Sequence, residues 1–552
     1  MLPVRLPLML GEVAAEVAAV SATESAGALS LLPPLLAIGL ALLLRRIGWA
    51  LLIGVVAGAL IVARGDVVEA VVRLFRDYLV GDSESAYAHG LILVFTTLLG
   101  TMVGVITRNG SMQALIARLI RPGRDRRHGQ QLTCGLGLAV FFDDYANTLV
   151  VGTSMRPITD RLKISREKLA FLIDATAAPV AGLAVISTWV AFEVGEIQSA
   201  FRLEAGQQVN AYWIFVQTLP YRFYSILLLV FVWTVARSGR DFGPMARAEH
   251  RAVSTGAVSR VGSAAAVAMD ELPAGAKRRG LAVNAVVPLL GLVLLLVAGL
   301  CVLGGDLALE VMLAASLLAS LVSVVLTLAS GALSFRETLV GWYLGGSSMF
   351  AALWILVLAW GLGAVCGREA LGTGTYLAEL AGQSLPVELM PALSFVLAAG
   401  IALATGSSFS TMTLLIPISV GMTWNLLEAP LVDDPLMLGA LGAVLAGAIF
   451  GDHCSPISDT TVLSSAASGC DHLDHVATQA PYAFAIAITS LLVGYVPIGW
   501  GVPVVICLPA GLAVAIAIPL VLGRLPGEPH VQEKQQGQQG QQGQAELVVD
   551  PE

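Results

Sequence analysis

The chain has 552 residues, of which 56% are hydrophobic and 13% charged, and its formal net charge is −8. Soluble domains carry about 25% charged residues, so this composition excludes an ordinary soluble protein and predicts an all-α polytopic membrane protein. The six cysteines are scattered without a C-x-x-C pair, which gives no sign of a disulfide framework or a zinc site. No basic stripe indicates nucleic acid, and we expect no cofactor.

Residues 1–27 are expected to form an N-terminal lead-in, and a first membrane half is expected at 28–237. Residues 130–155 are flanked on both sides by basic segments, RPGRDRRHG and RPITDRLKISREK. Because basic flanks are typically cytoplasmic, this stretch is expected to enter and leave on one side as a re-entrant hairpin. The other apolar stretches are near the ~20 residues that cross a bilayer and predict spans at 28–44, 47–63, 89–107, 167–193 (a broken helix) and 211–235.

A mobile cytoplasmic linker loop at 238–279 is expected to precede a second membrane half at 280–524. This half contains a second predicted hairpin at 385–420. Its spans are predicted at 281–303, 307–331, 340–366, 437–468 (a broken helix), 477–499 and 502–523. The chain is thus expected to have about 11 spanning helices plus two re-entrant hairpins, with the C-terminus cytoplasmic. Residues 525–552, rich in Gln and Gly, predict a disordered polar tail.

Three segments of the first half resemble three segments of the second half in the same order. GTMVGVITRNGSMQALIARL aligns with GLGAVCGREALGTGTYLAEL, FFDDYANTLVV with LATGSSFSTMT, and FLIDATAAPVAGLAVIST with AIFGDHCSPISDTTVLSS. The alignment sets Thr148 opposite Thr411 and Pro179 opposite Pro456. An odd number of predicted spans lies between the hairpins, so the second copy is inverted. Inverted repeats with interrupted helices are typical of secondary transporters.

Polar residues of these segments are expected to converge near the middle of the membrane. Pro179 and Pro456 break their helices, and the freed backbone groups must be bonded by protein, water or a bound ion. No Lys or Arg lies between Arg368 and Arg524, so a mobile cation could neutralise the carboxylates, which at membrane depth usually mark a pathway. The candidate ion- and substrate-binding residues are Asp143, Asp144, Asn147, Thr148, Asp174, Thr176, Thr405, Ser407, Ser408, Thr411, Asp452, His453, Ser455, Ser458, Asp459 and Thr460.

These groups are rich in oxygen and poor in thiol, which suits hard cations such as Na⁺. The residues assigned to Na⁺ are Asp143, Asn147, Asp452 and Asp459. Structural roles remain open for several of the others. Asp174 can cap its broken helix, His453 can donate to a ligand instead of binding the ion, and Ser or Thr hydroxyls can bond a carbonyl one turn back.

The motifs FFDDYANTLVVG, AAPVAG, ATGSSFSTM and GDHCSPISDTTVLSS resemble those of the NhaC-type Na⁺/H⁺ antiporter family, which also includes malate/lactate–Na⁺ exchangers. The resemblance runs from about residue 30 to about residue 523. It implies the ion-transporter fold, a homodimer in the cell (inner) membrane, and ion or substrate binding by the Asp, Asn, Thr, His and Ser residues of the first and last of these motifs.

The leading hypothesis is therefore a secondary transporter, not an enzyme, that exchanges Na⁺ for H⁺ by alternating access. The alternative is a Na⁺-coupled exchanger of small carboxylates or amino acids. A remote alternative is an intramembrane aspartyl protease, suggested by the Asp residues of FFDDY and FGDH, but it leaves the inverted repeat unexplained. The expected partners are membrane lipid, Na⁺, H⁺ and, in the alternative, a small organic acid.

Overall fold

The structure is a computed structural model that describes residues 27–526, apart from gaps at 45–46, 81–82, 113, 116–124, 206–208, 261–280, 304–306, 368, 374–375, 377–378, 381–384 and 457. The predicted lead-in and polar tail lie almost wholly outside the described residues. The described chain is nearly all helical, which confirms the predicted class. Within it, seven helices are long and apolar enough to cross a membrane, or nine if each of two bent pairs counts as one span.

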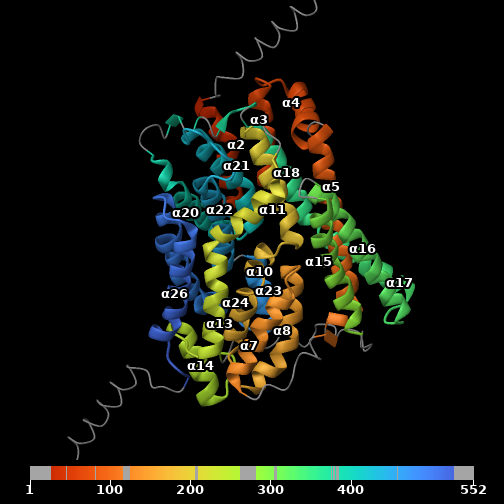
Figure 1. The fold of residues 1–552 in the computed structure, drawn as a ribbon, viewed down its shortest axis with the longest axis vertical. Helices are drawn as coiled ribbons and strands as arrows, with labels where there is room; N and C mark the ends of the chain where they lie inside the picture. The colour runs from red at the N-terminus through yellow and green to blue at the C-terminus, as the bar shows by residue number, and fades with distance from the viewer. Residues whose placement is uncertain are drawn as a thin grey trace, which may run out of the picture.

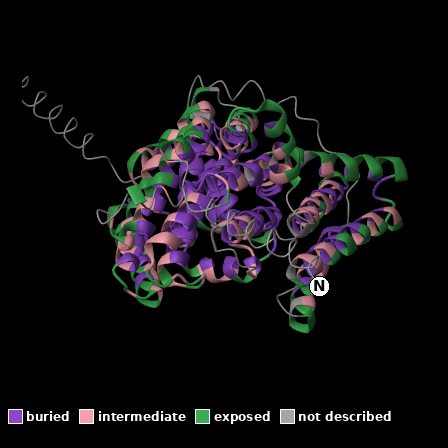
Figure 2. Ribbon diagram, turned by 90° about the horizontal axis from the view of Figure 1, so that it is seen from above, coloured by how far each residue is buried: buried purple, intermediate pink, exposed green. Residues whose placement is uncertain are grey.

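One group of eight helices carries no predicted site residue, and we call them the scaffold helices. They are α2 (Leu32–Leu44), α3 (Ile47–Val62), α4 (Val67–Arg73), α5 (Ser83–Arg108), α15 (Val283–Leu303), α16 (Ala308–Ala329), α17 (Phe335–Ser348) and α18 (Phe350–Cys366). α5 packs against α16 and α17 at one side of the molecule, on the right in Figure 1. Figure 2 shows that buried residues gather mainly in the larger body of the molecule.

The first polar unit is a helical hairpin followed by a helix that is broken twice. The hairpin arms are α7 (Arg126–Ala139) and α8 (Asp144–Arg161), and the next helices are α9 (Arg166–Asp174), α10 (Ala178–Leu183) and α11 (Thr188–Ala205). Arg126 donates to the carbonyl of Leu162 at 3.4 Å, so both ends of the hairpin lie on one side. Pro179 is in the first turn of α10, where its missing N–H costs no helical bond. The break predicted in 167–193 therefore contains an additional short helix.

The second polar unit repeats this plan. Its elements are α20 (Met390–Thr405), α21 (Ser408–Leu426), α22 (Pro435–Cys454) and α23 (Asp459–Ser468). A hydroxyl–hydroxyl bond of 2.8 Å between Ser394 and Ser419 ties the two hairpin arms. α22 ends before Pro456, as the sequence predicts. In Figure 1 the first hairpin occupies the lower end of the molecule and the second lies in the upper half, which is the inverted arrangement expected.

The two hairpin turns share one kind of helix cap, and this fixes the register of the repeat. Asp143 caps α8 by accepting from the N–H of Ala146 at 2.7 Å, and Ser407 caps α21 by accepting from the N–H of Ser410 at 3.4 Å. Both cap residues have extended backbones, as helix N-caps do. Matching the caps sets Asn147 opposite Thr411, so the expected pairing of Thr148 with Thr411 is one residue out of register.

The two units exchange their broken helices. α23 of the second unit packs against α8 and α9 of the first, while α11 of the first unit packs against α21 of the second. Each broken helix therefore completes the core of the other unit. This reciprocal packing brings both breaks to the centre of the larger body, between the two hairpins.

Further helices enclose the two units, and one of them is bent where a single span was expected at 211–235. They are α12 (Ala211–Thr218), α13 (Phe223–Ser238), α24 (His472–Thr489), α25 (Val496–Gly499) and α26 (Val504–Leu522). α12 and α13 meet at 51°. Pro220 lies in the 3₁₀ turn between them and cannot donate a helical bond, while the buried Arg222 that follows donates to Thr218 and to the carbonyl of Gly182.

Part of the expected linker loop at 238–279 is folded as α14 (Gly243–Thr255). Glu249 on this helix accepts from Arg126 at 2.5 Å and from the N–H of Ser165 at 2.7 Å. Just before the helix, Asp241 forms a buried ion pair with Lys168. These contacts anchor α14 to the hairpin and to α9, so this part is not the mobile loop expected from its composition. The remainder, 261–280, lies outside the described residues.

α5 and α17 cross at glycines. Gly100 and Gly104 on α5 meet Gly341 and Gly345 on α17, and this small-residue spacing is typical of close helix contacts in membranes. A Cβ atom at Gly104 would lie 2.5 Å from the Cα and 2.8 Å from the N of Gly345. Both atoms belong to the backbone, so the two helices would have to move apart to accept it.

We therefore predict that Gly104→Ala destabilises the protein by about 1–3 kcal/mol, the usual cost of overpacking. The readout is the thermal unfolding midpoint of detergent-purified protein. Gly291→Ala on α15 is the matched control, because a Cβ atom there meets nothing within 4 Å. Equal midpoints for the two variants would contradict the close crossing of α5 and α17.

Candidate functional site

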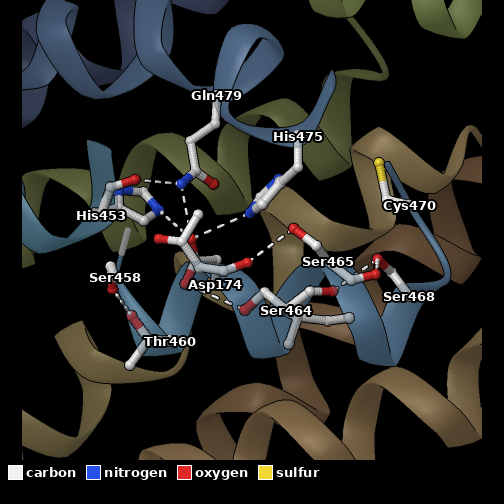
Figure 3. Close-up of polar contacts among 12 residues, drawn as sticks. Asp174, His453, Ser458, Thr460, Ser464, Ser465, Ser468, Cys470, His475 and Gln479 are labelled. Carbon is white, nitrogen blue, oxygen red and sulfur yellow. Dashed lines mark hydrogen bonds and ion pairs between the residues drawn. The ribbon is translucent and has the colours of Figure 1, made fainter. Parts of the chain in front are cut away.

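The two helix breaks meet at a buried polar cluster. Asp174 ends α9, His453 lies in the last turn of α22, and the Oδ2 of Asp174 is 3.8 Å from the Nε2 of His453. Gln479 of α24 bridges them, since its Nε2 donates to the Oδ2 of Asp174 at 2.7 Å and to the carbonyl of His453 at 2.5 Å. Figure 3 shows these side chains pointing toward Asp174. The first and second units are thus joined at their breaks.

The Asp174 carboxylate is bonded on both oxygens by other side chains. Oδ2 also contacts the Nε2 of His475 at 3.2 Å, and Oδ1 accepts from the hydroxyl of Ser464 at 3.2 Å. On the far side of His453, the Nδ1 shares a hydrogen bond of 2.8 Å with the hydroxyl of Tyr224. The cluster therefore satisfies its own carboxylate, and Asp174 connects elements of both units instead of only capping its own helix.

Asn147 connects neighbouring elements by hydrogen bonds at the first hairpin tip. Its amide nitrogen donates to the carbonyls of Gly137 at 2.7 Å, Thr176 at 2.8 Å and Val140 at 3.2 Å. These carbonyls belong to the end of α7 and to the first break, so one side chain fastens the tip to the broken helix. The Oδ1 of Asn147 and the hydroxyl of Thr148 are buried and have no hydrogen-bond partner within the described part of the chain.

At the second break, Asp452 is held by hydroxyls. Thr460 donates to the Oδ2 of Asp452 at 3.1 Å, and Ser458 lies 2.9 Å from the Thr460 hydroxyl. Ser455, the C-cap of α22, is buried, and its N–H bonds the Asp452 carbonyl at 3.1 Å. Asp459 begins α23, but its side chain lies outside the described residues.

Asp143 and Asp144 line a cavity between the first hairpin and the scaffold helices. This narrow chamber has a volume of about 100 Å³, and its other lining residues include Thr188, Phe192 and Phe409. Asp143 accepts from the Thr188 hydroxyl at 3.2 Å, a bond between the hairpin tip and the start of α11. No Lys or Arg is among the described residues that line the chamber.

A wide cavity of about 580 Å³ adjoins the narrow chamber. Asp143, Tyr145 and Met349 line both cavities. The wide cavity lies between the first turns of α8 and the glycine crossing of α5 with α17, and it extends as far as Arg108. Its volume falls in the range of about 300–1,000 Å³ usual for small-molecule sites, so it is large enough to lead a hydrated ion or a small organic molecule to the two carboxylates.

The second hairpin meets this chamber through an aromatic ring and not through its hydroxyls. Thr405 and Thr411 bond carbonyls one turn back, at Ile401 and Ser407, and Ser408 bonds the Ala448 carbonyl at 3.2 Å. Thr176 of the first break also bonds one turn back. The single convergence expected from the sequence is therefore resolved into the acidic chamber and the bonded networks around Asn147, Asp174 and Asp452.

Several buried polar residues of this region were absent from the sequence prediction. Arg222 and Glu193 form a buried ion pair of 2.7 Å, and Arg222 also donates to the Gly182 carbonyl at the end of α10. A fixed cation does therefore lie next to the first break. The further residues are Thr188, Glu196, Tyr224, Ser464, His475 and Gln479. The charged members could have been found, because charges inside apolar segments usually mark function.

We predict that Asn147→Ala lowers the thermal unfolding midpoint of the purified protein. Removing the amide leaves buried carbonyls of two elements without a donor, at about 1–3 kcal/mol for each unsatisfied group. Asn147→Asp should lower the midpoint as well, because a carboxylate cannot donate. Thr153→Val is the control, since that exposed hydroxyl bonds only the Leu149 carbonyl of its own helix. An unchanged midpoint in Asn147→Ala would contradict the role given to this amide.

The sequence profile of the Na⁺/H⁺ antiporter family matches residues 180–500. A Haemophilus influenzae protein described as uncharacterized is 32% identical over 496 residues, covering 85% of this chain and 91% of that protein. The arginine/ornithine antiporter ArcD of Halobacterium salinarum is 39% identical over 106 residues, 19% of each chain. The Na⁺/H⁺ antiporter NhaC of Alkalihalophilus pseudofirmus is 40% identical over 72 residues, 13% of this chain and 14% of that one. Among solved structures, the YdaH transporter of Alcanivorax borkumensis aligns with a TM-score of 0.53 at 18% identity, over 86% of this chain and 99% of that one.

Proposed function

The chain belongs to the Na⁺/H⁺ antiporter family and is an integral membrane secondary transporter, and we propose that it exchanges Na⁺ for H⁺ by alternating access. The observation that carries this proposal is the narrow chamber, in which Asp143 and Asp144 are buried side by side. No Lys or Arg is among the described residues that line this chamber, so a mobile cation, either Na⁺ or a proton, can supply the positive charge that buried carboxylates require.

The cargo site in this proposal is centred on Asp143 and Asp144. Asn147 and Asp452, which the sequence assigns to Na⁺ as well, are bonded into the networks of the hairpin tip and the second break. We assign them the task of holding these elements in place. Asp174 and His453 join the two breaks, so a displacement of either unit is transmitted to the other.

Exchange follows if the carboxylates always hold either Na⁺ or a proton when they cross the membrane, and never cross it empty. An empty, ionised chamber would be costly to move through the membrane, because a charge at midplane costs roughly 2.5–3.5 kcal/mol on insertion scales. In this proposal the wide cavity, which Asp143 also lines, is the route of access from one side. The inverted second unit provides a means of opening to the other side. We extend the proposal to a homodimer in the cell (inner) membrane with a cytoplasmic C-terminus.

We predict that Asp143→Asn and Asp144→Asn keep the fold but reduce Na⁺-driven proton flux more than tenfold. Asn preserves size and hydrogen bonding while removing the titratable charge. The measurement is Na⁺ jumps on proteoliposomes that contain an internal pH dye. Asp160→Asn is the control, because Asp160 forms a partly exposed ion pair with Arg166, of the kind worth about 0–1 kcal/mol.

The same assay tests competition between the two ions. Because a proton and Na⁺ would occupy the same carboxylates, the apparent affinity for Na⁺ should fall as the pH is lowered. Wild-type flux in both Asn variants would remove the carboxylates from the mechanism. An affinity for Na⁺ that does not change with pH would show that the two ions do not share a site.

A second candidate function is exchange of a cationic amino acid. The sequence leaves exchange of small carboxylates or amino acids as an alternative, and the chamber favours a cationic amino acid. The chamber combines two carboxylates with Phe192 and Phe409, and acidic groups beside aromatic rings suit organic cations. The local similarity to an arginine/ornithine antiporter agrees with this chemistry. A small carboxylate is less suited, because it would meet two aspartates.

Loading proteoliposomes with unlabelled arginine, ornithine, lactate or malate separates the candidates. If the second candidate holds, internal cationic amino acid should accelerate uptake of labelled arginine at least tenfold, while lactate and malate should not. The Asp143→Asn variant serves as the negative control for this uptake. Na⁺-driven proton flux without any amino acid present would instead support Na⁺/H⁺ exchange.

A further inference from the structure

α11 and α21 carry a second buried acidic site directly behind the narrow chamber. Phe192 of α11 and Phe409 of α21 form part of the chamber wall, and their rings pack edge to face with centroids 4.7 Å apart. One turn further along each helix, the Oε1 of Glu196 accepts a hydrogen bond of 3.2 Å from the hydroxyl of Thr413. The aromatic pair therefore separates Glu196 from Asp143 and Asp144.

Glu196 differs from its neighbour Glu193 in how its charge is managed. Both are buried, at 1% and 0% exposure. Glu193 is paired with the guanidinium of Arg222 at 2.7 Å, whereas Glu196 accepts a hydrogen bond from the neutral hydroxyl of Thr413. Across the part of the chain that the structure describes, no Lys, Arg or His forms an ion pair with Glu196. A buried carboxylate in this state is stable only when it takes up a proton or a mobile cation.

The elements packed around α11 are α5, α10, α12, α18 and α21. Their titratable or charged side chains within the described residues are Tyr87, His89 and Arg108 of α5, Tyr212 of α12 and Cys366 of α18. α10 and α21 carry none, and α11 itself adds Glu193 and Arg202. His89 is stacked on Trp360 with ring centroids 3.6 Å apart. None of these groups neutralises Glu196 by an ion pair.

We propose that Glu196 is a second proton-binding carboxylate of the transport cycle, which the Phe192–Phe409 pair separates from the acidic chamber. When ionised, Glu196 accepts the hydrogen bond from the Thr413 hydroxyl. When neutral, it carries the transported proton on its own carboxyl oxygen. Its location at the contact between the first unit and the second hairpin exposes it to any movement of α21 against α11. This inference rests on the proposed exchange of Na⁺ for H⁺, and it adds one proton to the number exchanged for each Na⁺.

The first test is the ratio of protons to Na⁺ in proteoliposomes, obtained from the ion gradients at which net flux stops. Glu196→Gln should carry one proton fewer per Na⁺ than the wild type and should still exchange labelled Na⁺ for Na⁺. Asp160→Asn should leave the ratio unchanged. An unaltered ratio in Glu196→Gln would overturn the inference. Loss of Na⁺/Na⁺ exchange in a folded Glu196→Gln protein would also overturn it, because Glu196 would then belong to the cargo site.

The second test does not require transport, so it separates failure of this inference from failure of the proposed function. Infrared spectra of purified protein should show a carboxylic acid carbonyl band that titrates with pH and is missing from Glu196→Gln. Thr413→Val removes the donor that favours the ionised form, so the midpoint of this band should move to higher pH. A spectrum of Glu196→Gln identical to wild type would overturn the proton site even if Na⁺/H⁺ exchange is absent in both.

Discussion

A helix that stops inside a membrane leaves carbonyl groups with no water to bond, and the rest of this structure depends on how these groups are satisfied. At the first break the Asn147 amide bonds the Thr176 carbonyl together with two carbonyls of the hairpin tip. At the second break Gln479 bonds the His453 carbonyl and the Asp174 carboxylate. Each polar side chain thus fastens a break to a neighbouring element, and the breaks become the points where the elements are joined.

This way of satisfying the breaks separates two kinds of polar residue. Asp174 and Asp452 accept hydrogen bonds from side chains of the protein, and those bonds connect elements. Asp143 and Asp144 differ in that they also line a cavity, although Asp143 accepts a hydrogen bond from Thr188 as well. The difference is useful to a transporter, because Asp174 and Asp452 can hold the elements together while a cargo enters and leaves the cavity. A single cluster with both tasks would lose its internal bonds whenever an ion left.

The sequence predicted much of this arrangement from local chemistry. Pro456 and the polar residues around it predicted the second break, and the basic flanks of 130–155 predicted the first hairpin. Partners that approach from distant elements could not be predicted in the same way. His475 and Gln479 lie on a helix whose rotation toward Asp174 is set by packing. The bend at Pro220 and the pairing of Arg222 with Glu193 likewise depend on contacts that local patterns do not encode.

The exchange of broken helices between the two units has a consequence for how the protein is made. Asp174 is separated from Ser464 by 290 residues of chain and from Gln479 by 305. Synthesis proceeds at about 5–20 residues per second, so on the order of 15 to 60 seconds pass before these partners emerge. During that interval the first unit lies in the membrane before α23 and α24 are present to cover its acidic break. Biogenesis must therefore shelter a polar half-molecule until the second half is inserted, and the native core closes only after synthesis is almost complete.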